Sequence, residues 1–288
     1  NLSEKPIGMF LLLLFTVLIS KFIFLFISDF ILNYLWSINI DVLMKDIVNQ
    51  DFKYVNAQKL IGFIDQIGTF LVPAIVIIKF KTEIIFEIKK ISIKDIYLIS
   101  FLLILLLAST NILNLFSQSI NIPFVSESWI AYFKSQQLLQ ESIQSNFMGT
   151  SFKSLLINLF IMALTPAICE ELFFRGSLQP ILINWSKKKS TGIILSSIIF
   201  GILHFQAEYF LAIVFASILF GYLYVIKRNI IYGIIIHFCF NAVSLIMMQL
   251  INNGIYKEEF LEKIINYAIT PIGLTMGIIW YYKNFKKG

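Results

Sequence analysis

The sequence predicts an all-α fold, a polytopic membrane bundle of about eight transmembrane helices. Two features of its composition support this prediction: the mean hydropathy is +0.82, and 58% of the 288 residues are hydrophobic whereas only 14% are charged. Such values lie far outside the range of soluble domains. The third observation is that apolar runs of about 20 residues, the length that crosses a bilayer, recur along the chain.

The predicted spans follow these runs in order. The first three cover residues 7–36, 60–80 and 96–116. A semi-polar stretch, 120–150, follows and contains Trp129, Tyr132 and Phe133, which is typical of a helix at the membrane interface. The remaining five predicted spans cover residues 152–174, 191–205, 209–226, 230–251 and 264–282.

The distribution of basic residues predicts the topology of the bundle. The net charge is +6, but the Lys and Arg residues collect in the short loops after the second, fourth, sixth and eighth spans. By the positive-inside rule both termini then face the cytoplasm. This pattern indicates membrane orientation and argues against a nucleic-acid partner. We divide the chain into residues 1–150 with three spans and the interfacial segment, a core at 151–252, and a C-terminal helix at 253–288.

A charged cluster interrupts the fourth apolar run. Glu170, Glu171 and Arg175 follow directly on it, although one ionised group at mid-bilayer costs about 2.5–3.5 kcal/mol. Consecutive helical residues diverge by about 100°, whereas Arg175 lies one turn beyond Glu171 on the same face. Arg175 is therefore expected to neutralise Glu171 and to leave Glu170 for a partner on another helix. The alternative is a purely structural ion-pair cluster of all three.

The two histidines of the chain, His204 and His237, both fall inside predicted spans. Phe200 shares a helical face with His204, and Asn241 lies one turn after His237. Two donors on one rigid helix could stabilise an oxyanion that forms on a carbonyl. For either histidine alone, a satisfied structural hydrogen bond is the simpler interpretation. Two histidines and a carboxylate on three predicted spans favour one shared site.

These motifs, Glu170-Glu171-x-x-x-Arg175, Phe200-x-x-x-His204 and His237-x-x-x-Asn241, resemble the signature of the CPBP family of intramembrane proteases, over about a third of the chain. That family includes type II CAAX prenyl endopeptidases, bacteriocin-processing proteins and bacteriocin-immunity proteins. The resemblance implies an endopeptidase with its site among the fourth to seventh helices, in a bacterial cytoplasmic membrane. It implies that Glu170 activates water with help from His204. His237 and Asn241 would bind the oxyanion, while Glu171, Arg175 and Phe200 support the site.

Cofactor use stays open at this point. The family is often labelled metalloprotease, and Glu170, His204 and His237 could supply the three protein ligands of a catalytic zinc. The chain contains no His-Glu-x-x-His pair, however, which favours a metal-free site. His204 also lies about twice as far from the start of its span as His237 does. Extension of the seventh span or a bend after Gly201 is needed to bring the two histidines to one depth.

The leading functional hypothesis is an intramembrane endopeptidase that hydrolyses a peptide bond of a membrane-associated, lipidated or hydrophobic substrate. Its partners would be that peptide or lipidated protein and the lipid bilayer. The alternative is a non-catalytic membrane partner of the same fold, such as an immunity or export-assisting protein. A transporter is disfavoured because the polar intramembrane residues gather in one half of the chain without a repeat-related counterpart.

Overall fold

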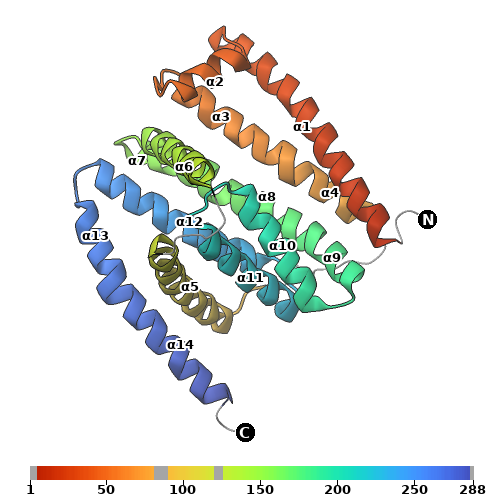
Figure 1. Cartoon of the computed structure of the whole chain (residues 1–288), viewed down its shortest axis with the longest axis vertical. Coiled ribbons are helices and arrows are strands. Elements are labelled where there is room, and N and C mark those ends of the chain that lie inside the picture. The colour runs from red at the N-terminus through yellow and green to blue at the C-terminus, as the bar shows by residue number, and fades with distance from the viewer. Residues whose placement is uncertain (1–4, 81–89, 120–125, 286–288) are drawn as a thin grey trace.

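A computed structural model describes residues 5–80, 90–119 and 126–285 of the chain, and within these ranges every regular element is a helix (Figure 1). The all-α fold is therefore confirmed. Several helices continue through π-helical segments, which are labelled η. In chain order the elements are α1 (Pro6–Trp36), α2 (Ile40–Val48), α3 (Val55–Gln66), η2 (Ile67–Leu71), α4 (Val72–Phe80), α5 (Ile93–Ser119), α6 (Glu127–Phe147), α7 (Phe152–Asn158), η3 (Leu159–Leu164), α8 (Thr165–Phe173), η4 (Phe174–Leu178), α9 (Gln179–Ser186), α10 (Lys189–Leu203), α11 (Phe210–Lys227), α12 (Ile231–Asn252), α13 (Glu258–Ile264), η5 (Ile265–Ile269) and α14 (Thr270–Phe285).

Six helices of the described ranges are long and apolar enough to cross a membrane. They cover Pro6–Trp36, Val55–Phe80, Ile93–Ser117, Phe152–Ser186, Phe210–Lys227 and Ile231–Asn252. The predicted spans at 191–205 and 264–282 are helical but are not among the six. With 15 residues, α10 extends about 22 Å at 1.5 Å per residue, which is less than the ~30 Å hydrocarbon core. The chain is thus an integral, multi-pass membrane protein.

The first helices form a hairpin at one edge of the molecule, where α1 lies beside α3 and α4 (Figure 1). The Ser20 hydroxyl donates a hydrogen bond of 2.5 Å to the carbonyl of Gly68 in η2, which ties α1 to the π-helical segment. The hairpin packs on the centre of the fold, because Met9 and Leu13 of α1 share a hydrophobic core with Phe174. The first hairpin, which precedes residue 150, and the helices that follow this residue thus share one hydrophobic core.

The central helix runs from Phe152 to Ser186 and contains the two π-helical segments η3 and η4. A proline follows each segment closely, Pro166 after η3 and Pro180 after η4. Proline has no backbone N–H to donate, so the preceding turn relaxes into wider hydrogen-bonding geometry. The helix therefore continues past Gly176 and Pro180, and it ends at Ser186 before the left-handed residue Lys187.

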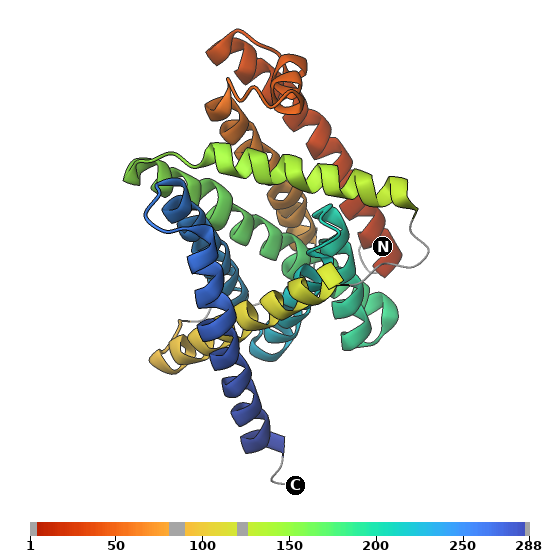
Figure 2. The same ribbon diagram turned by 60° about the vertical axis from the view of Figure 1, so that its left-hand side comes forward.

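Helix α6 occupies most of the stretch predicted to lie at the interface, although residues 120–125 lie outside the described ranges. It runs crosswise over the bundle (Figure 2). Its last residue accepts a hydrogen bond of 2.6 Å, donated by the buried Lys59 ammonium to the carbonyl of Phe147. In its middle, Gln140 accepts a hydrogen bond of 2.6 Å from Gln206, in the turn after α10. Helix α6 therefore links the first hairpin to that turn.

Candidate active site

Two adjacent carboxylates on α8 form the centre of the site, and both are buried. Glu171 is fully inaccessible to solvent and Glu170 is 6% exposed. The Glu171 Oε1 atom lies 3.0 Å from Arg175 Nη1 and accepts a hydrogen bond of 3.2 Å from His237 Nδ1. The ion pair predicted between Glu171 and Arg175 is thus present, and a histidine from α12 completes it.

Arg175 is held by polar contacts through its two terminal nitrogens and by aromatic rings. Its Nη2 atom donates hydrogen bonds of 2.8 Å to both the backbone carbonyl and the hydroxyl of Ser217 on α11. The guanidinium carbon lies 5.4 Å from the ring centroids of Phe200 and Phe220, within range of a cation–π interaction. A planar guanidinium suits this place better than an ammonium because it donates in two directions while its faces contact aromatic rings.

Glu170 has weaker contacts than its neighbour. Its Oε1 atom accepts a hydrogen bond of 3.3 Å from the Gln66 side chain on α3, and its Oε2 atom lies 3.9 Å from His237 Nε2. The second distance exceeds that of a direct hydrogen bond. Because the two carboxylates diverge, His237 faces both of them, one with each ring nitrogen. Glu170 was expected to have a partner on another helix, and the structure shows two such residues, Gln66 and His237.

The His237 ring is fixed by its neighbours on three helices. It stacks on Phe220 at a centroid distance of 5.6 Å and meets Phe200 edge-on at 6.3 Å. One turn before it on α12, Gly233 leaves room for Glu171, since a Cβ atom there would lie 2.7 Å from Glu171 Oε2. The Nδ1 atom carries a proton, because a carboxylate oxygen can only accept.

His204, in contrast, is bound through the backbone of Phe200 and not through a carboxylate. Its Nδ1 atom is 2.8 Å from the backbone carbonyl of Phe200 and must donate to it, so Nε2 is the accepting nitrogen of the neutral ring. Among the described residues, no carboxylate oxygen lies within 4 Å of its ring nitrogens. The histidine beside Glu170 in these contacts is His237, and assistance of Glu170 by His204 stays a prediction.

Of the two routes expected to bring the histidines to one depth, the structure shows the bend after Gly201 and not the extension of the seventh span. Helix α12 begins at Ile231 and is not extended, whereas α10 ends at Leu203 and the chain turns at Phe205, whose φ is +53°. His204 therefore lies at the helix terminus. The Phe200 ring contacts both imidazoles, with centroid distances of 4.5 Å to His204 and 6.3 Å to His237.

The side chains named as zinc candidates do not form a ligand set. Within the described residues, no group of three His, Cys, Asp or Glu side chains is placed to hold a metal ion. Glu170 Oε2 and His237 Nε2 lie 3.9 Å apart, but His204 does not join them in a group of three among the described residues. This donor arrangement does not fit the three-ligand geometry of catalytic zinc. Asn241, the other predicted oxyanion donor, is half-buried on α12 one turn beyond His237.

Sequence reasoning missed several contributors to this site. Gln66, Ser217, Phe220 and Gly233 all contact a predicted residue, yet none belongs to the motifs. The spacing of Gly233 and His237, one helical turn apart, is the one local signal that could have found a member of this group. These side chains pack closely around the predicted residues. A cavity between the start of α1 and the end of α9 is lined by none of the predicted site residues.

Residues 152–243 match the family model described as Type II CAAX prenyl endopeptidase Rce1-like. The matched region is less than half of the chain, but it includes all seven residues predicted for the site. The resemblance inferred from the motifs is therefore confirmed over these residues. Comparisons with curated proteins and with solved structures gave no match.

Proposed function

We propose that this protein is an intramembrane endopeptidase in which Glu170 activates water to hydrolyse a peptide bond of a membrane-associated, lipidated or hydrophobic peptide. The observation that carries the proposal is the unequal bonding of the two buried carboxylates. Glu171 is fully buried and its Oε1 atom is bound to both Arg175 and His237, whereas Glu170 is held only by an amide at 3.3 Å and faces an imidazole at 3.9 Å. A general base needs such an available oxygen.

The charges of the cluster support the same division of roles. Two carboxylates and one guanidinium leave one net negative charge when His237 is neutral. A proton taken up by Glu170 from attacking water would neutralise the cluster, which favours proton transfer in a buried environment. Glu171 and Arg175 then hold the negative and positive charges that keep His237 oriented. No metal is needed for this step.

The remaining side chains would act on the carbonyl. Asn241 presents an amide from the same helix as His237, and we propose that it donates to the developing oxyanion. His204 presents Nε2 toward water or substrate, because its Nδ1 proton is already bound to Phe200. Compared with the roles implied by the resemblance, His237 takes the place beside the base and His204 acts from the end of α10.

Access to this site favours a substrate that is itself in the membrane. Glu170, Glu171, Arg175 and His237 are each at most 6% exposed, so a peptide reaches them only when helices separate. The surrounding helices are apolar on their outer surfaces, which a lipidated or hydrophobic segment can follow. We therefore propose that the substrate enters from within the bilayer.

The test is cleavage by the reconstituted protein. Wild type is incubated in vesicles with a library of fluorogenic peptides, with and without an attached lipid, beside Glu170→Gln and the control Glu262→Gln, an exposed carboxylate outside the spans. Loss of a general base lowers turnover by about 10²–10⁴-fold. We expect that loss for Glu170→Gln alone, with unchanged thermal unfolding. Equal turnover of both variants would refute the role of Glu170.

The non-catalytic alternative makes the opposite prediction. If the protein acts only as a membrane partner, Glu170→Gln preserves its cellular phenotype, because a neutral amide of the same shape keeps the packing. Loss of the phenotype in Glu170→Gln but not in Glu262→Gln supports the endopeptidase.

A further inference from the structure

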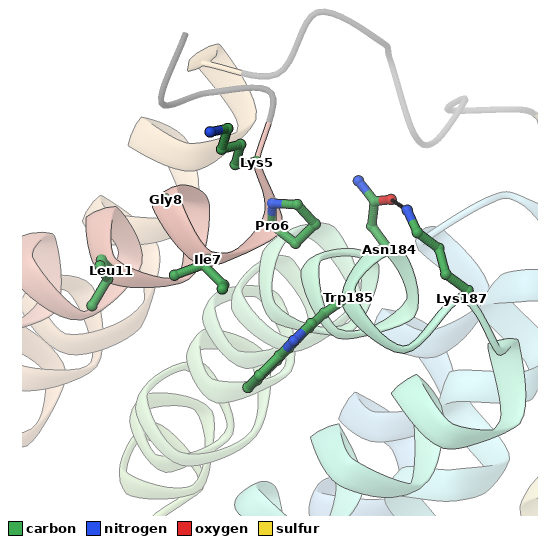
Figure 3. Close-up of a pocket in the computed structure, with 8 residues that line it drawn as sticks. All are labelled: Lys5, Pro6, Ile7, Gly8, Leu11, Asn184, Trp185 and Lys187. Atoms are coloured by element: carbon green, nitrogen blue, oxygen red, sulfur yellow. Dashed lines mark hydrogen bonds between the residues drawn. The ribbon is translucent and has the colours of Figure 1, made fainter.

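A cavity of about 670 Å³ lies between the start of α1 and the end of α9. Figure 3 shows its lining, which has two kinds of side chain. Lys5, Asn184 and Lys187 carry polar groups at one end, and Ile7, Leu11 and Trp185 provide an apolar wall. None of these residues belongs to the candidate active site.

The polar end offers donors and positive charge. Lys5 is the residue that precedes α1, and its side chain cannot cap the helix because it has no acceptor. The first turn of α1 has no acidic residue, and no side-chain cap is seen at its start among the described residues. Lys187 donates a hydrogen bond of 3.0 Å to Asn184, and no carboxylate pairs with either lysine in the described contacts. An occupant of this end must be an anion with several acceptors.

The apolar wall requires a second property of the occupant. Ile7, Leu11 and Trp185 are 58%, 57% and 54% exposed, and Trp185 contacts the Phe10 ring at 6.2 Å. Because α1 is long and apolar enough to cross a membrane, we expect acyl chains to lie along this wall. A tryptophan beside lysines is typical of the level where headgroups meet hydrocarbon. The occupant is therefore amphiphilic, with an anionic head and an apolar chain.

We propose that this cavity binds an anionic phospholipid of the surrounding bilayer. The phosphate lies between Lys5 and Lys187, and an acyl chain lies along Ile7, Leu11 and Trp185. Basic pockets between transmembrane helices on the cytoplasmic side bind such headgroups, and the distribution of Lys and Arg predicts that this end of the bundle is cytoplasmic. The bound lipid joins α1 to α9, the helix that continues from Arg175. This inference does not depend on the proposed function.

Lys187 permits a substitution that removes charge without disturbing the backbone. Its φ is +57°, in the left-handed region that glycine adopts at least cost. Lys187→Gly is therefore compatible with the fold, and Lys5→Gln removes the second charge at the start of α1. The matched control is Lys153→Gln with Lys257→Gln. Lys153 lies at the other end of the same long helix as Trp185, and both control lysines are exposed.

The experiment is native mass spectrometry of the full chain in detergent, titrated with phosphatidylglycerol, phosphatidylcholine or glycerol 3-phosphate. We expect wild type to bind phosphatidylglycerol more tightly than phosphatidylcholine, and to bind glycerol 3-phosphate weakly. One basic residue near an anionic headgroup strengthens binding about 5-fold. The Lys5→Gln, Lys187→Gly double variant should therefore lose about 25-fold in phosphatidylglycerol affinity, while the control variant keeps the wild-type value.

Each other result overturns the proposal. Equal binding of the two lipids to wild type would show that charge does not select the occupant. An unchanged affinity in the double variant, with thermal unfolding as in wild type, would place the lipid elsewhere. The same loss in the control variant would indicate general surface charge. Displacement of the lipid by glycerol 3-phosphate at similar concentration would indicate an aqueous phosphate site.

Discussion

The tight contact between α12 and Glu171 yields a sharp prediction, since a single methyl group added at Gly233 should disturb the whole ion-pair cluster. A Cβ atom there would lie 2.7 Å from Glu171 Oε2 and 3.3 Å from its carboxylate carbon. An ordinary contact is 3.4 Å, so the oxygen must retreat by about 0.7 Å. Elsewhere a flexible carboxylate would move at little cost, but this one is fully buried and bound to Arg175 and His237.

The magnitude follows from two opposing effects. Overpacking a well-packed interior costs about 1–3 kcal/mol. Replacing a helical glycine by alanine stabilises the helix by up to about 1 kcal/mol. We therefore expect Gly233→Ala to lower the free energy of unfolding by about 1–2 kcal/mol and to reduce turnover by at least about 10-fold, because His237 loses its fixed orientation.

Gly62 provides the control. It also lies in a helix of a membrane span, and a Cβ atom added there meets nothing within 4 Å. Gly62→Ala should therefore leave turnover unchanged and stability equal or slightly higher. Combining Gly233→Ala with Glu171→Asp withdraws the carboxylate by one methylene and should restore part of the stability. Denaturant-induced unfolding in micelles and peptide turnover measure both quantities. If Gly233→Ala behaves like Gly62→Ala, Glu171 is not held as the structure describes.

Three further predictions concern the same cluster. Gln66→Met should lower turnover about 10-fold without loss of folding, because a hydrogen bond to a charged group is worth about 1.5–3 kcal/mol. If the Gln66→Met variant keeps the turnover of wild type, Glu170 needs no orientation from α3. Arg175→Lys should unfold more easily than wild type, since one ammonium cannot bind Ser217 and Glu171 in the same directions; a thermal unfolding midpoint equal to that of wild type would contradict this. A chelator should leave peptide turnover unchanged, and loss of turnover that added zinc restores would overturn the metal-free mechanism.

The sequence predicts most of the fold because membrane spans are encoded locally. An apolar run of sufficient length must form a helix in lipid, where backbone groups have no other partners. The same local rule placed Arg175 beside Glu171, since residues four apart share a helical face. Helix α10 was predicted at residues 191–205 and lies at Lys189–Leu203, and the turn at Phe205 is a bend after Gly201, one of the two alternatives that the sequence left open. No glycine marks the left-handed residue of this turn, so the sequence did not decide between the alternatives.

Contacts between helices were harder to predict than contacts within them. Gln66 and Glu170 are 104 residues apart, and their hydrogen bond exists only because α3 packs against α8. Periodicity says which face of a helix is polar, but it does not say which helix that face meets. The same reason explains why the neighbour of Glu170 is His237 instead of His204. Both histidines fall inside predicted spans, so the sequence treats them alike. Only the packing around Phe200 distinguishes them.

The first hairpin is therefore part of the site and does more than anchor the chain. The Rce1-like match begins at residue 152, yet a carboxylate inside it accepts a hydrogen bond from Gln66. Gln66 directly precedes η2, and η2 is tied to α1 through the bond from Ser20 to Gly68. A shift of α1 along the bundle would thus move the amide that orients Glu170. The helices outside the matched region thus contribute to the orientation of a carboxylate inside it, although they carry none of the motif residues.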